Sequence, residues 1–130
     1  MKKQLIIQGS SIHGIASFYK EINRVFMADE QWDLAESLDA LDDLLYGGFG
    51  AARGATALEI TWLDMEVSRL SLGYEETRRY YLEKLRPGSP FNKALFSEKL
   101  KALDNSEGKT YFDLVMEVFL SHPLISVVSG

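Results

Sequence analysis

Three aspartates occupy a short leucine-rich stretch of the chain, Asp39, Asp42 and Asp43 in the sequence SLDALDDLLYGG. Asp39 and Asp43 have the i, i+4 spacing of neighbours on a helix, where like charges cost about 0.2–0.5 kcal/mol. Asp42 and Asp43 also approach the end of the expected helix, where the dipole disfavours negative charge by about 0.3–1 kcal/mol each. One interpretation is a solvated acidic face. The interpretation we favour is a surface that meets a concentrated positive charge, such as the phosphate-binding site of a nuclease.

Other chemistries are less well supported by the residue types. Paired carboxylates can act as general acid and base, but no sequence signature of an aromatic-lined cleft accompanies them. The two histidines, His13 and His122, are too few and too far apart for a three-ligand metal site, and we expect structural or surface roles for both. The glycine-rich stretch YGGFGAARGA lacks the preceding strand and the Gly-Lys-Ser/Thr of a phosphate-binding loop. We therefore predict that the protein is not an enzyme and needs no cofactor.

The negative charge of the chain is concentrated in one segment. The net charge is −5, and no lysine or arginine lies between Arg24 and Arg53. That interval holds seven of the 19 acidic residues: Asp29, Glu30, Asp33, Glu36, Asp39, Asp42 and Asp43. Residues 29–43 are called the acidic segment below. Such a segment attracts cationic partners, and the overall balance argues against direct binding of nucleic acid.

Length and composition predict an ordinary globular chain. A sequence of 130 residues fits one domain with one core. It has no apolar run long enough for a membrane span, and its first residues, MKKQLIIQ, resemble a strand more than a signal peptide. The absence of cysteine excludes disulfides and thiolate metal sites. We expect a cytoplasmic protein that does not interact with membranes.

The periodicity of apolar residues predicts helices between strands. Expected strands cover about residues 3–8, 58–63 and 124–128, and expected helices about 14–27, 33–46, 64–72, 75–86, 89–103 and 110–121. Asp33 or Ser37 is the cap of the second helix, whose predicted buried stripe is Leu34, Leu38, Leu41 and Leu45. Thr110 and Asp113 resemble a capping box at the start of the last helix. Alternating helices and strands indicate an α/β fold, a three-stranded parallel sheet covered by helices.

Aromatic residues flank the acidic helix. Tyr46 and Phe49 border the glycine turn that follows it, and Trp32 precedes it. Exposed aromatic side chains beside a charged patch are typical anchors of protein interfaces. Packing of Tyr46 and Phe49 onto the first helix is an equally good interpretation of the sequence alone.

The second helix resembles a known family. The run Ser37-Leu38-Asp39-Ala40-Leu41-Asp42-Asp43, followed by Leu45 and Gly47, is similar to the second helix of the barstar family. The similarity extends to Ile6-Ile7-Gln8-Gly9 and Ile12, to the strand at 58–62 and to the strand at 125–128, and covers about residues 2–72 and 110–128. Two departures are clear: Asp42 replaces an aromatic residue, and residues 73–108 form a helical insertion before the last helix and strand.

The resemblance implies an inhibitor of a basic, barnase-type, extracellular ribonuclease. In that family the second helix and its loops plug the active site of the enzyme and mimic RNA phosphates. Asp39 and Asp43 match the acids that contact the enzyme, Asp43 the deeper of the two, Gly47 matches the glycine at the helix end, and Glu117 matches a further acid. The expected partner-binding residues are Trp32, Asp33, Glu36, Asp39, Asp42, Asp43, Tyr46, Gly47, Phe49 and Glu117.

We expect a monomer when the protein is free. The alternative is an interaction or assembly module that keeps the fold without inhibiting a ribonuclease. Asp42 in place of an aromatic residue and the insertion at 73–108 favour that alternative. The sequence leaves open whether the insertion packs on the sheet or contacts a partner.

Overall fold

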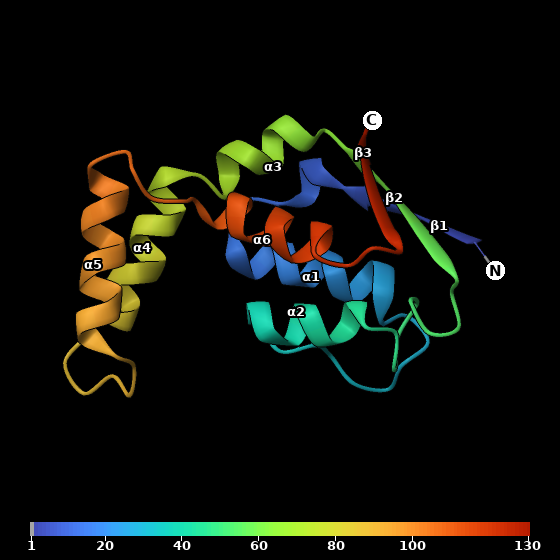
Figure 1. Cartoon of the computed structure of the whole chain (residues 1–130), viewed down its shortest axis with the longest axis horizontal. Coiled ribbons are helices and arrows are strands. Elements are labelled where there is room, and N and C mark those ends of the chain that lie inside the picture. Colours follow the sequence, from blue (N-terminus) through green and yellow to red (C-terminus); the bar gives the residue numbers. More distant parts are fainter. Residues whose placement is uncertain (1) are drawn as a thin grey trace.

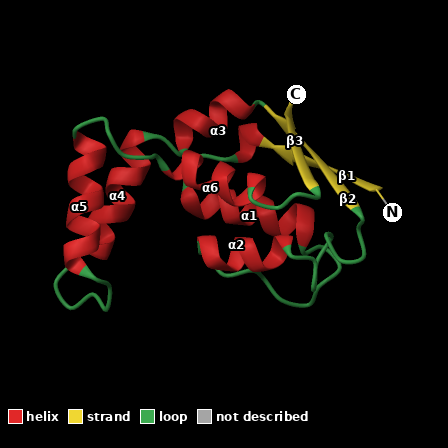
Figure 2. Ribbon diagram, in the orientation of Figure 1, coloured by secondary structure: helices red, strands yellow, loops and turns green. Residues whose placement is uncertain are grey.

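The computed structural model describes residues 2–130, and it confirms the α/β class. Strands and helices alternate along the chain, and helices make up the connections between successive strands (Figures 1 and 2). The elements are β1 (Lys2–Gln8), the 3₁₀ turn η1 (Gly9–Ser11), α1 (Ile15–Phe26), α2 (Leu38–Leu45), β2 (Ala57–Leu63), α3 (Met65–Ser71), α4 (Tyr74–Lys84), α5 (Lys93–Asp104), α6 (Tyr111–Leu120) and β3 (Ile125–Ser129).

The sheet is parallel throughout and has the strand order β1-β2-β3. In its register Ile7 lies opposite Trp62, and Ile60 lies opposite Val127. The alternating pattern of β2 buries every second side chain, as a strand with one covered face requires. Figure 2 shows the helices gathered on one side of the three strands. The opposite face stays open, and Ile6 on β1 is 51% exposed there.

Trp62 lies at the centre of the core between the sheet and the helices. Its side chain is fully buried, and its ring stacks on Phe18 of α1 at 6.2 Å between centroids. The rings of Phe112 and Phe119 of α6 meet it edge-on at 5.7 and 6.0 Å. The indole N–H donates to Ser68 Oγ at 2.9 Å, so the one polar atom of the side chain is satisfied. Trp62 thereby joins β2 to α1 and α6.

Two helices begin later than the sequence predicted. Helix α2 starts at Leu38 with Ser37 as its cap, so the prediction of a start at Asp33 was wrong and the alternative cap was correct. The Leu34 N–H donates to Asn23 Oδ1 of α1 at 2.7 Å, and this bond holds the preceding segment outside the helix. Helix α5 starts at Lys93, not at Ser89, and Asn92 caps it there by accepting the Leu95 N–H at 3.0 Å. The predicted Thr110–Asp113 capping box of α6 is confirmed.

The insertion at 73–108 folds as a helical hairpin, made of α4 and α5 and called the α4–α5 hairpin below. It stands beside the helical layer and away from the sheet (Figure 1). Glu76 at its base accepts the Ile15 N–H of α1 at 2.7 Å. Thr77 Oγ1 accepts the Tyr111 N–H of α6, also at 2.7 Å. The hairpin is therefore anchored through the start of α4 to two helices of the body.

None of the helices within residues 2–130 is both long enough and apolar enough to cross a membrane.

Glu21 is a buried carboxylate that holds α1 against the end of β1. It accepts the Gln8 N–H at 2.7 Å and two hydrogen bonds from Arg24, at 2.8 and 2.6 Å. Burial opposes its ionisation, but the bonds from Arg24 and Gln8 outweigh that effect and lower the pKa of Glu21 below its usual range. A lowered folded-state pKa adds stability above the unfolded-state pKa, and this stability is lost as the pH falls through the folded-state value.

Replacement of Glu21 by glutamine is expected to lower the free energy of unfolding near neutral pH by about 1–3 kcal/mol, since charge-assisted bonds are lost. The difference between the variant and the wild type is expected to shrink as the pH falls from about 6 to about 3. Urea unfolding across this pH range measures the difference in the free energy of unfolding. The exposed Glu107→Gln variant controls for the loss of one charge, and a difference for Glu21→Gln that does not change with pH would contradict the prediction.

Candidate partner-binding site

Asp39 and Asp43 lie on the exposed side of α2. The other side of the helix buries Leu41, Leu44 and Leu45, and the side chain of Ser37 caps the helix by accepting the Ala40 N–H at 3.1 Å. Within residues 2–130, neither the Asp39 nor the Asp43 carboxylate forms a hydrogen bond or an ion pair with another residue. A rigid, capped helix therefore presents two uncompensated charges one turn apart, as the sequence predicted.

Asp42 differs from the two neighbouring acids because it faces the body of the protein. Its Oδ1 lies 2.7 Å from Nε2 of His122, whose side chain is 8% exposed. The ring of Tyr46 meets the imidazole edge-on at 4.7 Å between centroids. Imidazole N–H donation to the carboxylate joins α2 to the residue that follows α6. This contact gives His122 a structural role, and it offsets the cost of a carboxylate at the end of α2.

Removal of the Asp42 carboxylate is expected to cost about 1–3 kcal/mol of the free energy of unfolding, since the buried imidazole of His122 loses its hydrogen-bond partner. A double-mutant cycle of Asp42→Ala and His122→Ala, measured by urea unfolding, is expected to give a coupling energy of about 0.5–3 kcal/mol. Asp39→Ala on the same helix is the control. It should leave the free energy of unfolding unchanged or raise it by a few tenths of a kcal/mol, because a like-charge pair is removed. Additive effects in the cycle would rule out the contact as a stabilising one.

The segment before α2 presents further acids from an irregular loop. Asp33 and Glu36 are exposed and lie outside the helix on which the sequence placed them. Between them the Leu34 side chain is 5% exposed and anchors the loop to the core. The loop thus holds Asp33 and Glu36 on the protein surface next to the start of α2.

Two of the three expected aromatic anchors are exposed. Trp32 is 50% exposed and Tyr46 is 75% exposed. Phe49 is half-buried against the core, and the Trp32 ring packs on it at 5.0 Å between centroids. The structure therefore brings together Trp32, from the segment before α2, and Phe49, from the turn after it. Phe49 supports the exposed Trp32 ring.

The turn after α2 depends on glycine. Gly47 has a φ of +88° directly after the helix, which is the left-handed conformation that ends many helices. Gly50 has a φ of +72°, and a Cβ there would lie 2.7 Å from Leu44 Cδ1 and 2.9 Å from the Phe26 carbonyl oxygen. The close approach at Gly50 holds the turn carrying Phe49 tightly against α2. Glu30 of the acidic segment supports it by accepting the Gly50 N–H at 3.2 Å.

Glu117 lies on α6 and is partly neutralised. Its Oε1 is 2.8 Å from Lys109 Nζ, and its side chain is 53% exposed. The sequence placed Glu117 in the partner-binding set through the resemblance alone. In the structure its charge is compensated, in contrast to those of Asp39 and Asp43.

The site offers an electrostatic surface formed by exposed carboxylates. No group of three or more histidine, aspartate or glutamate residues within residues 2–130 could hold a metal ion. No protein-family model matches the chain, and no curated protein matches it.

Proposed function

We propose that this protein inhibits a basic ribonuclease of the barnase type by inserting α2 and its flanking loops into the active site. The observation that carries the proposal is the pair of exposed, unpaired carboxylates of Asp39 and Asp43 on one side of a capped helix. Their i, i+4 spacing separates the Cβ atoms by about 5–6 Å. Two fixed anionic groups at this spacing are suited to lysine and arginine side chains that otherwise hold RNA phosphates.

The surrounding residues fit the same role. Trp32 and Tyr46 add exposed aromatic area of the kind that anchors interfaces. Asp33, Glu36 and the rest of the acidic segment raise the rate of encounter with a basic enzyme. Asp42 acts indirectly in this proposal, since its contact with His122 holds α2 in place. The resemblance of residues 37–47 to the barstar family supports the proposal independently of the geometry.

The proposal is tested by titrating the protein into a barnase-type ribonuclease at low and at physiological salt, with RNA cleavage followed in parallel. Tight binding that weakens with salt, together with loss of cleavage at one equivalent of inhibitor, is expected because the attraction is between exposed charges. Binding without loss of cleavage would place the contact outside the active site. Absence of binding at low salt would overturn the proposal.

One observation favours the alternative of an assembly module. All-parallel sheets normally have both faces covered, yet here the face opposite the helices exposes Ile6 and Val128, at 51% and 43%. A self-associated form would cover that face. Sedimentation analysis tests this alternative: a stable oligomer supports the assembly module, and a monomer at working concentrations excludes self-association.

A further inference from the structure

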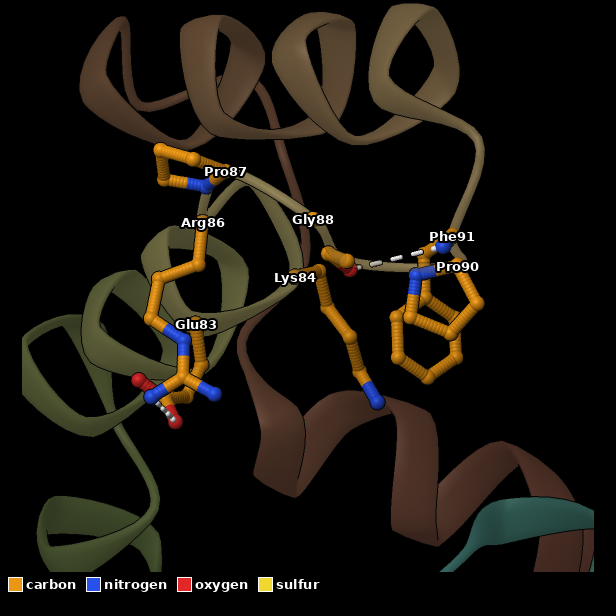
Figure 3. Close-up of a pocket in the computed structure, with 8 residues that line it drawn as sticks. Glu83, Lys84, Arg86, Pro87, Gly88, Pro90 and Phe91 are labelled. Atoms are coloured by element: carbon orange, nitrogen blue, oxygen red, sulfur yellow. Dashed lines mark hydrogen bonds and ion pairs between the residues drawn. The ribbon is translucent and has the colours of Figure 1, made fainter.

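Three side chains form a row along the α4–α5 hairpin. Tyr80 and Lys84 lie one turn apart on α4, and Phe91 lies in the connection to α5. Lys84 Nζ is 5.0 Å from the centre of the Tyr80 ring. It is 3.8 Å from the centre of the Phe91 ring, and Figure 3 shows both of these side chains at the tip of the hairpin. Within residues 2–130 Lys84 has no ion pair with a carboxylate, and Phe91 is 45% exposed. The row therefore holds the Lys84 ammonium group against two aromatic rings. Its outer ring, Phe91, is exposed to a partner.

The row begins against α6, the helix on which α2 also packs. The Tyr80 ring meets Tyr111 of α6 edge-on at 5.1 Å between centroids. Burial raises the pKa of the Tyr80 hydroxyl, and the nearby charge of Asp39 raises it further. Four residues along α4 correspond to a rise of about 6 Å, so Lys84 lies one turn beyond this contact.

The hairpin projects to the same side of the molecule as α2. Figure 1 shows the connection between α4 and α5 and the helix α2 both at the lower edge of the view, with α4 nearer to the body than α5. A partner that covers α2 and extends toward the hairpin would therefore meet α4 and the tip of the hairpin before α5. Helix α5 forms the outer side of the hairpin, away from that partner.

In the described part of the chain, the tip of the hairpin carries an unpaired positive charge, whereas α2 carries unpaired negative charges. A shallow pocket of about 270 Å³ is lined there by Lys84, Pro87, Pro90 and Phe91, among others (Figure 3). Glu83 at its edge is paired with Arg86 at 3.4 Å, which leaves the Lys84 charge uncompensated. A cation beside apolar rings and prolines suits a carboxylate side chain, whereas the acidic helix suits cations.

We propose that the α4–α5 hairpin is a second arm of the partner-binding surface, whose row of Tyr80, Lys84 and Phe91 binds a carboxylate-bearing rim beside the active site of the same ribonuclease. This inference rests on the proposed function. Two sites of opposite charge, fixed on one rigid frame, set the orientation of the partner and reject enzymes whose rim is basic. The hairpin would then select among basic ribonucleases, while α2 blocks the active site.

Two variants of the row test the inference against two matched variants of the outer helix. Lys84→Met keeps the aliphatic stem, and Phe91→Ala removes the outer ring. Their controls are Lys99→Met and Leu95→Ala on α5, where Leu95 is 47% exposed. The dissociation constant for a barnase-type ribonuclease is expected to rise about fivefold for each row variant and to stay within about twofold for each control. Lys84→Glu is expected to weaken binding further than Lys84→Met, because like charges then face each other.

The outcomes separate this inference from the proposed function. If Asp43→Ala abolishes tight binding while all row variants match the wild type, the hairpin is not a contact arm and only the inference fails. If the wild type neither binds nor inhibits the enzyme, both fail. Thermal unfolding checks the fold of each variant, and a loss of affinity in Lys84→Met at an unchanged melting temperature supports a direct contact. Equal losses in Lys84→Met and Lys99→Met would also overturn the inference.

Discussion

Replacement of Asp43 by alanine is expected to weaken binding to a barnase-type ribonuclease by at least about 2 kcal/mol, roughly 30-fold in the dissociation constant. The Asp43 carboxylate is exposed on α2 and has no partner within residues 2–130, so its full charge is available to the enzyme. Truncation leaves the cations of the active site desolvated and unpaired in the complex, which is the costly part of such a change. Calorimetric titration at physiological salt measures the effect.

Two comparisons make this result specific. Glu107→Ala removes an exposed charge distant from α2, and it should change the dissociation constant less than about twofold. Asp39→Ala should weaken binding, but less than Asp43→Ala. Neither substitution on α2 removes a bond within the free protein, so thermal unfolding should show no loss of stability. Equal effects of Asp43→Ala and Glu107→Ala on binding would exclude α2 as the interface.

Replacement of Trp62 by alanine is expected to lower the free energy of unfolding by about 3–5 kcal/mol, the range for a large buried aromatic residue. Trp62 is fully buried against Phe18, Phe112 and Phe119, so its loss leaves a cavity between the sheet and both covering helices. For a chain of this size the melting temperature should fall by on the order of 10 °C. Differential scanning calorimetry measures the change.

Trp32→Ala is the matched control for this prediction. The same chemical change is made at a residue that is 50% exposed and whose ring contact is with Phe49 at the surface. Its stability cost should stay near or below about 1 kcal/mol, whereas its effect on ribonuclease binding should exceed that of any core variant that still folds. A larger loss of stability for Trp32→Ala than for Trp62→Ala would contradict the assignment of the core.

Local patterns in the sequence were sufficient for most of the elements. The alternation in residues 58–63 predicted β2, and the Thr110–Asp113 capping box predicted the start of α6. Errors arose where two local signals competed. Both Asp33 and Ser37 can cap a helix, and the bond from the Leu34 N–H to Asn23, eleven residues away along the chain, decided between them.

In the candidate site, too, local features could be predicted from the sequence, whereas contacts between distant segments could not. The sequence alone identified the acidic segment and the shared helical side of Asp39 and Asp43, because charge and i, i+4 spacing are local properties. It did not reveal that Asp42 contacts His122, since these residues are 80 positions apart and the contact depends on how α2 packs against α6.

The sequence by itself determined the class of the fold, the approximate extent of its helices and strands, and the place where negative charge accumulates. The tertiary structure decided the strand order, the position of the α4–α5 hairpin beside the helical layer, and which acids remain unpaired. The reason is physical: helix and strand formation follow periodicity within a few residues, whereas pairing and burial depend on contacts between segments that only the packed core brings together.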